Sequence, residues 1–292
     1  MRYETVHELR LAYSVPVWEH HLEVRLTPQH NAHQHVLAVE VEIEPAGEPR
    51  SYHDCFGNRV HYASLIAPHD TLAVRVRAQV ETSLDNPFAY ATVAPQSERE
   101  WVAQSLRAQP RLWDYVLHRS PATPDLTALP IADLARLARE PGQPVLDSVM
   151  AALEWMGEAI AYEPEFTHTP AKLEDTLARR SGGCQDLAHL LITIARAWGF
   201  PARYVMGYQD PAYAEEDEVE QQPHAWAEIM VPGAGWRGID PTTRLVANQT
   251  YIAVGIGRDA ADAAPLKAVF KSGEEGEAAA QADVVLAVTR DQ

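Results

Sequence analysis

Residues 181–199 form the segment that most constrains how this chain can fold. Two glycines, Gly182 and Gly183, stand directly before a cysteine, and a helical repeat of apolar residues follows at Leu187, Leu191, Ile194 and Trp198. Gly199 supplies the stop that commonly ends a helix. The pattern therefore predicts a helix with one deeply buried face, which carries Cys184 rigidly in its first turn.

The position of Cys184 makes it a candidate nucleophile, with a buried structural thiol as the alternative. A helix N-terminus carries roughly half a positive charge, which favours a thiolate. The glycines before it would let a substrate carbonyl approach the backbone without meeting a Cβ atom. The backbone N–H of Cys184 is the natural donor to an oxyanion, whereas the second donor stays open among Gln185, Tyr162 and Tyr208.

Two later motifs supply an imidazole and a carboxylate for this thiol. His224 opens a predicted strand after a proline, and Asp240 closes the next strand. An imidazole can take the proton of a thiol, and a carboxylate can fix the imidazole tautomer and stabilise the imidazolium. We therefore predict a catalytic triad of Cys184, His224 and Asp240. Trp226 and Trp236 either flank this triad or pack the hairpin against the core helix.

The loop between these two strands offers a test of the triad. The strands are predicted over residues 224–231 and 235–240. In an antiparallel hairpin, residues directly opposite each other point to the same face of the sheet. A loop with an odd number of residues, such as residues 232–234, puts Asp240 on the same face as His224. A loop with an even number of residues puts it on the opposite face. The triad therefore requires an odd loop or a β-bulge.

Alternation of apolar and polar residues dominates the first ninety or so residues. It is clearest over residues 37–44 and 72–80, where every second side chain is apolar. Such a period of two is typical of strands with one wet face. Phe56-Gly57-Asn58 between apolar runs signals a hairpin turn. Several short strands of this kind predict a small antiparallel β-sandwich, which forms an N-terminal domain over residues 1–92.

From residue 93 the pattern changes to helices followed by strands. Ser97 and Glu100 resemble a capping box. Helices are predicted over residues 126–139 and 145–162, with a short helix over residues 170–180. Besides the hairpin, strands are predicted over residues 202–208, 250–256, 266–271 and 284–289. Residues 93–292 are therefore predicted to be a catalytic domain of the α+β class, in which the helix bearing Cys184 packs on an antiparallel sheet.

Composition limits the partners and the compartment of the protein. The formal net charge is −17 at pH 7, which argues against nucleic acid or an anionic membrane surface as a partner. Two cysteines, Cys55 and Cys184, do not make the dense disulfide framework of a small secreted domain. The N-terminus lacks the apolar stretch of a signal peptide, and no apolar run is long enough to span a membrane. We therefore predict a cytoplasmic protein, and its oligomeric state stays open.

Other side chains that can carry chemistry have simpler interpretations. The histidines at 30, 33, 35, 53 and 61 fit no zinc spacing, so no metal or cofactor is predicted. Cys55 lies beside a hairpin turn and is interpreted as structural. Asp186 is either a site residue or an acid that the first helical turn favours. Arg258, Asp259 and Asp262 are expected to form salt bridges. The acidic residues 215–220 either attract cationic substrates or form a solvated loop.

Four motifs, in order, resemble those of the bacterial transglutaminase-like family. They are Gly-Gly-Cys-Gln-Asp-Leu-Ala-His (182–189), Pro-Ala-Arg-Tyr-Val-Met-Gly-Tyr (201–208), His-Ala-Trp-Ala-Glu (224–228) and Gly-Trp-Arg-Gly-Ile-Asp-Pro-Thr (235–242). The resemblance extends to residues 54–58 and 254–262. It implies a papain-like core, as in animal transglutaminases and peptide N-glycanases. It also implies Cys184 as nucleophile, His224 as general base and acid, and Asp240 as the orienting residue.

The sequence is compatible with three functions. In the first, the Cys184 thiolate attacks a peptide or amide carbonyl and water resolves the thioester, as in a cysteine protease or amidase. In the second, an amine resolves the thioester, as in a transglutaminase acting on glutamine. In the third, the fold binds peptides without catalysis. The intact triad favours the first two functions, and hydrolysis ranks first because it requires only water.

Overall fold

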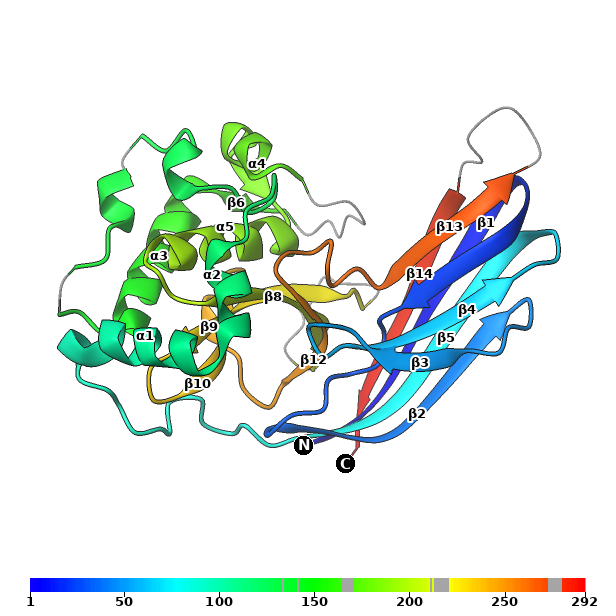
Figure 1. Ribbon diagram of the computed structural model, residues 1–292, viewed down its shortest axis with the longest axis horizontal. Helices are drawn as coiled ribbons and strands as arrows, with labels where there is room; N and C mark the ends of the chain where they lie inside the picture. Colours follow the sequence, from blue (N-terminus) through cyan, green and yellow to red (C-terminus); the bar gives the residue numbers. More distant parts are fainter. Residues whose placement is uncertain are drawn as a thin grey trace.

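The computed structural model describes residues 1–132, 134–140, 142–163, 171–210, 212, 221–272 and 280–291. The chain forms two packed units, a curled antiparallel sheet and a core of helices on a second antiparallel sheet (Figure 1). The α+β class predicted from the sequence is therefore confirmed. Among the described residues, no helix has the length and apolar character needed to cross a membrane.

The curled sheet is built around one long central strand, β1. Along one edge of β1 run β5 and then β4, and along its other edge run β14 and then β13. β2 pairs with β5, and β3 pairs with β4, on the outer side. The strands are β1 (Arg2–Val24), β2 (Gln34–Glu44), β3 (Arg50–His53), β4 (Arg59–Leu65), β5 (His69–Thr82), β13 (Leu266–Ser272) and β14 (Ala280–Arg290).

This unit is one curled sheet rather than the two facing sheets of the predicted sandwich. The register of β1 shifts between Ala12 and Val17 against β5, and between Trp18 and His21 against β13. Such irregularities increase local twist and bend the strand, so the sheet folds over itself. The sheet buries aromatic side chains, among them Tyr13, whose ring lies 5.1 Å from that of Phe270 between centroids.

The pairing of β13 and β14 divides the chain differently from the predicted boundary after residue 92. Both strands belong to the sequence segment assigned to the catalytic domain, yet they pair with β1. Tyr3 lies opposite Arg290, so the two termini lie side by side (Figure 1). Strand alternation shows that a segment is a strand but not which sheet it joins, because both sheets can bury its apolar face.

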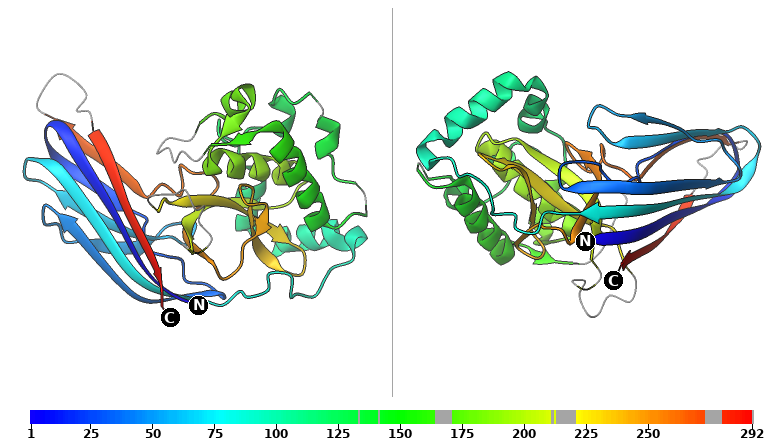
Figure 2. Two further views of the ribbon diagram at one scale, coloured as in Figure 1. Left: turned by 180° about the vertical axis from the view of Figure 1, so that it is seen from behind. Right: turned by 90° about the horizontal axis from the view of Figure 1, so that it is seen from below.

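The core places helices on one face of a five-stranded sheet. The strand order is β11-β10-β9-β8-β12, and the helix that begins at Cys184, α5, packs on β8 and β9. The core sheet lies between the helices and the curled sheet (Figure 2). The elements are α1 (Glu98–Ala108), α2 (Asp114–Leu117), α3 (Val145–Ala159), α4 (Leu173–Arg179), α5 (Cys184–Ala197), β6 (Ala161–Tyr162), β7 (Ser181–Gly182), β8 (Ala202–Gln209), β9 (His224–Val231), β10 (Gly235–Asp240), β11 (Leu245–Val246) and β12 (Tyr251–Gly257).

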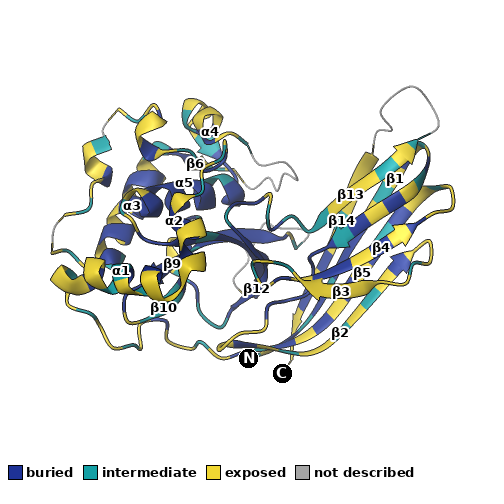
Figure 3. Ribbon diagram, viewed as in Figure 1, coloured by how far each residue is buried: buried dark blue, intermediate teal, exposed yellow. Residues whose placement is uncertain are grey.

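Burial is greatest where α5 meets β8 and β9, whereas the outer strands alternate between buried and exposed residues (Figure 3). The predicted helix over residues 126–139 is wrong. The chain forms two short 3-10 helices there, Leu126–Ala128 and Leu134–Leu137, because Pro130 removes a backbone donor and disfavours helical geometry at the residue before it. Further 3-10 turns cover Pro95–Ser97 and Pro110–Trp113.

Two helix starts differ from their predictions. Ser97 precedes α1 but makes no side-chain capping bond, and Glu98 is instead buried against Arg139 and the N–H of Val145. The helix predicted over residues 170–180 begins at Leu173, and residue 170, its expected first residue, lies outside the described residues.

Candidate active site

The start of α5 is fixed by close packing around its two glycines. Gly183 occupies the N-cap position, and its N–H donates to Asp186 Oδ2 at 3.1 Å. A Cβ atom at Gly182 would lie 2.9 Å from atoms of both Asp186 and Thr176. Gly182 is therefore required by packing, and Asp186 is a capping residue. Together they hold the side chain of Cys184, which is 5% exposed, at the helix N-terminus.

The hairpin of β9 and β10 has the predicted odd loop. Val231 pairs with Gly235, which leaves residues 232–234 as the turn. Gly233 adopts a φ of 83°, which a glycine tolerates without strain. With this register, His224 Nε2 and Asp240 Oδ2 lie 2.8 Å apart. The parity argument for the loop is therefore confirmed.

His224 connects the carboxylate to the thiol. Its Nε2 faces Asp240, and its side chain is also hydrogen-bonded to Cys184, for which Nδ1 is the remaining ring nitrogen. Burial lowers the pKa of His224, but the hydrogen bonds and charges of Asp240 and Cys184 outweigh burial and raise this pKa to about 10. The structure thus brings all three predicted triad side chains into one hydrogen-bonded series.

Asp240 is fully buried, yet it is held in the charged form. Burial raises its pKa, but the hydrogen bond and charge of His224 and the hydrogen bonds of Thr242 lower the pKa to about 2. Oδ1 accepts from the backbone N–H and the hydroxyl of Thr242 at 2.9 and 2.7 Å. Oδ2 accepts from the Tyr251 hydroxyl at 2.9 Å and from Gln209 Nε2 at 3.1 Å, in addition to His224.

These donors to Asp240 were not among the predicted site residues. Thr242 carries a local signal, because an aspartate two residues before a backbone N–H commonly forms this turn. No local pattern marks Gln209 or Tyr251, which reach Asp240 from β8 and β12. Only the assembled sheet brings them together.

Trp226 packs against His224 and Tyr251. It is 2% exposed, stacks on His224 with ring centroids 6.2 Å apart, and meets the edge of Tyr251 at 5.3 Å. A Cβ atom at Gly207 or at Gly238 would lie 2.5 or 3.0 Å from atoms of the indole. The two glycines therefore make room for the indole between β8 and β10.

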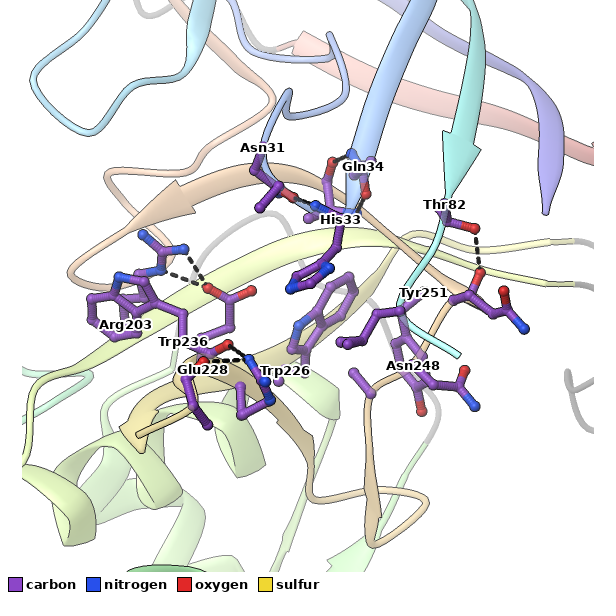
Figure 4. Close-up of a pocket in the computed structure, with 18 residues that line it drawn as sticks. Asn31, His33, Gln34, Thr82, Arg203, Trp226, Glu228, Trp236, Asn248 and Tyr251 are labelled. Carbon is purple, nitrogen blue, oxygen red and sulfur yellow. Dashed lines mark hydrogen bonds and ion pairs between the residues drawn. The ribbon is translucent and has the colours of Figure 1, made fainter. Parts of the chain in front are cut away.

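A pocket of about 280 Å³ lies beside Trp226 and Tyr251, where the curled sheet meets the core sheet. His33 points into it toward Trp226, and the ion pair of Arg203 and Glu228 lies at its other side (Figure 4). Trp236 lines the same pocket, with the Arg203 guanidinium 4.1 Å from the centre of its ring.

The predicted oxyanion donors lie in different places. Tyr162 pairs with Gly182 between β6 and β7, beside the turn that leads to Cys184, and Gln185 is buried next to the thiol. The hydroxyl of Tyr208 instead lies 2.9 Å from His7 Nδ1, so it contacts the curled sheet. Tyr204 is a further phenol near the sulfur: burial raises its pKa, and so does the charge of Cys184.

The remaining candidates lie outside the triad. Cys55 is a free, exposed thiol. The expected salt bridges are confirmed, with Arg258 and Asp262 at 2.7 Å and His118 and Asp259 at 3.0 Å. The part of the chain that the structure describes contains no group of three or more side chains able to hold a metal ion. The acidic residues 215–220 lie outside the described residues.

Comparisons with known proteins place the chain in a family. Residues 132–241 match the transglutaminase-like superfamily, and residues 3–81 match the bacterial transglutaminase-like N-terminal region. The chain is 33% identical over 291 residues to an uncharacterized protein of Mycobacterium leprae, covering 99% of each. It is 30% identical over 119 residues to a protein-glutamine gamma-glutamyltransferase of Pseudomonas aeruginosa, which is 39% of this chain and 18% of that protein.

The fold has a counterpart among solved structures. The crystal structure of "a Putative Cysteine Protease from Cytophaga hutchinsonii" superposes with a TM-score of 0.73 at 21% identity, covering 100% of this chain and 92% of that one. The family match spans Cys184, His224 and Asp240, and the N-terminal match spans most of the curled sheet. The chain therefore belongs to the transglutaminase-like superfamily and carries the N-terminal region of its bacterial members.

Proposed function

We propose that the protein is a thiol-dependent amide hydrolase of the cysteine protease or amidase type. Cys184 is the nucleophile, His224 the general base and acid, and Asp240 the orienting carboxylate. The observation that carries this proposal is the 2.8 Å contact of His224 Nε2 with buried Asp240, on a ring that is also hydrogen-bonded to Cys184. The substrate class is a peptide or another amide.

The reaction follows from these positions. The Cys184 sulfur attacks the amide carbonyl carbon, and the oxyanion forms near the first free N–H groups of α5. The carbon–nitrogen bond then breaks as His224 gives its proton to the departing amine, which leaves a thioester. Water attacks the thioester while His224 accepts a proton, and the thiol and the free acid are released. Asp240 keeps the ring in line throughout, because its carboxylate stabilises the imidazolium.

The thiol chemistry can be tested without knowing the substrate. Alkylation by iodoacetamide, followed at each cysteine by mass spectrometry between pH 5 and 9, reports how readily each sulfur reacts. We expect His224→Ala to slow alkylation of Cys184 near pH 6 by about 10- to 100-fold, because the ring no longer holds the thiol proton. Exposed Cys55 is the internal reference in every sample.

A second histidine serves as the matched control. His118 is also paired with a buried aspartate, Asp259, but it belongs to a different cluster. His118→Gln should leave the alkylation of Cys184 unchanged. Equal rates in the wild type and in His224→Ala would remove the basis of the proposed function.

Acyl transfer to an amine is the second candidate. It is favoured by the similarity of the core to the Pseudomonas protein-glutamine gamma-glutamyltransferase. The two functions share the thioester and differ in what resolves it. A glutamine-containing peptide incubated with a primary amine would give the amine adduct in transfer and the free acid in hydrolysis, and mass spectrometry separates these products. We expect the free acid to predominate.

A further inference from the structure

Asp240 accepts hydrogen bonds from other residues besides His224, the residue that it orients. Three elements other than its own strand supply donors to its Oδ2 atom: His224 from β9, Gln209 from the end of β8 and Tyr251 from the start of β12. A carboxylate with no solvent contact needs such donors, because an unpaired buried charge is costly. Each donor also restrains the orientation of the carboxylate group.

Tyr251 and Gln209 form part of one network. The Tyr251 hydroxyl donates to Asp240 and lies 3.3 Å from the hydroxyl of Thr243, and it is also hydrogen-bonded to Gln209. The rings of Tyr251 and Trp226 pack edge to face. The titratable groups that face Asp240 are therefore His224 and Tyr251, with Cys184 beyond the imidazole.

Side chains of the N-terminal unit form hydrogen bonds to β12, the strand that carries Tyr251. Gln34 forms a paired contact with the backbone of Ala253, accepting from its N–H at 2.8 Å and donating to its carbonyl at 2.7 Å. Asn58 makes the same pair of bonds to Ile256, at 2.8 and 2.7 Å. Gln29 donates to the carbonyl of Val254 at 2.7 Å. Three buried amide side chains thus bond the backbone of β12 much as a neighbouring strand would.

The residues on both sides of Gln209, at the end of β8, form hydrogen bonds to the curled sheet. The hydroxyl of Tyr208 contacts His7 at 2.9 Å, and Asp210 accepts from the hydroxyl of Tyr3 at 2.9 Å. His7 and Tyr3 both belong to β1, the central strand of the curled sheet. The residues immediately before and after Gln209 are therefore anchored to the N-terminal unit.

We propose that Tyr251 and Gln209 are positioning residues for Asp240, and that the curled sheet fixes them by holding β12 and the end of β8. The inference rests on the proposed function, in which Asp240 orients His224. It gives the N-terminal unit a role in the chemistry of the core, although none of the triad residues lies in that unit. The pocket between the units borders the same residues, Trp226 and Tyr251 (Figure 4).

The test removes one donor at a time and reads the pH profile of Cys184 alkylation by iodoacetamide. Tyr251→Phe deletes a hydroxyl and keeps the ring, and Gln209→Met keeps the length of the side chain. With fewer donors the carboxylate is held less firmly against His224, so the imidazolium that stabilises the Cys184 thiolate is less favoured and the thiolate forms at higher pH. We expect the acid limb of the profile to move up by about half a pH unit to one unit in Tyr251→Phe, with roughly 3- to 10-fold slower alkylation near pH 5.

Gln209→Met should move the limb in the same direction by less, and the double variant should move it furthest. Tyr13→Phe is the matched control, since Tyr13 is a buried tyrosine of the curled sheet that does not touch Asp240. A purely structural role would lower the melting temperature without moving the limb.

Asp240→Asn separates failure of this inference from failure of the proposed function. The inference is overturned if Asp240→Asn slows alkylation of Cys184 while the acid limb stays in place in both Tyr251→Phe and the double variant. If Asp240→Asn and His224→Ala both leave the alkylation unchanged, the proposed function itself has failed, and the positioning role falls with it.

Discussion

At the scale of single residues, the imidazole of His224 is stabilised in its charged form despite burial. Desolvation opposes the imidazolium, and the bond to Asp240 and the interaction with Cys184 favour it more strongly. Asp240 is stabilised as a carboxylate by the same contact. The pair therefore contributes to stability as well as to the proposed chemistry, and the two contributions share one pH dependence.

The sign of this dependence follows from the direction of the shift. The folded pKa of His224, about 10, exceeds its ordinary value of 6.5. Its contribution to stability is therefore fully present below about pH 6.5 and is lost as the pH rises through about 10. We expect the free energy of unfolding to fall between pH 7 and 10 by roughly 2 to 4 kcal/mol more in the wild type than in His224→Gln.

Urea denaturation at pH 6, 8 and 10 measures this difference. His118→Gln, the control variant, should retain the decline of the wild type. A decline of equal size in wild type and His224→Gln would show that the imidazole is not held as an imidazolium.

At the scale of elements, α5 carries Cys184, and contacts at both of its ends fix its position. Asp186 and Gly182 pack its first turn. At the other end, buried Arg196 donates to the carbonyls of Tyr115, His118, Ala202 and Arg258 and to the hydroxyl of Thr123. The guanidinium thus joins the last turn of α5 to α2 and the loop after it, to β8 and to the segment after β12.

Replacing this guanidinium should destabilise the whole core. Arg196→Met keeps the apolar stem but leaves several buried carbonyl groups without a donor. We expect the free energy of unfolding to fall by about 3 to 5 kcal/mol in urea denaturation, since removing one partner of a buried network costs that much. Arg179→Met, at an exposed arginine in the last turn of α4, should stay within about 0.5 kcal/mol of the wild type. Similar losses in the two variants would contradict the role of Arg196.

The elements also show how far local sequence patterns reach. The helix of Cys184 and the parity of the loop at residues 232–234 were predictable, because both depend on spacing along one short segment. The return of β14 to β1 and the reach of Tyr251 to Asp240 were not, because each joins segments far apart in the chain. The helix predicted across Pro130 does not form, because the missing backbone donor of the proline outweighs the apolar spacing on which the prediction rested.

At the scale of the whole molecule, the two units share buried polar contacts and a common apolar core. The first and last strands of the chain pair with each other in the curled sheet, so the core is inserted between them. Units joined in this way should unfold together. Calorimetry of the full chain is therefore expected to show a single transition, with equal calorimetric and van't Hoff enthalpies.

Gln34 offers the sharpest test of this coupling. It is 4% exposed, and Gln34→Leu would leave the N–H of Ala253 without its acceptor and the carbonyl of Ala253 with one donor fewer, the remaining donor being the N–H of Gln29. We expect the unfolding free energy to fall by about 2 to 3 kcal/mol within one transition. We also expect the acid limb of Cys184 alkylation to move up, in the direction expected for Tyr251→Phe.

The control is Gln79→Leu, at an exposed glutamine on β5 of the same sheet, which should change neither quantity. Two separate transitions in Gln34→Leu, with the limb unmoved, would mean that the curled sheet is only attached to the core. A single weakened transition with a shifted limb would mean that the N-terminal sheet and the site respond together, because the strand that Gln34 holds is the strand from which Tyr251 reaches the carboxylate.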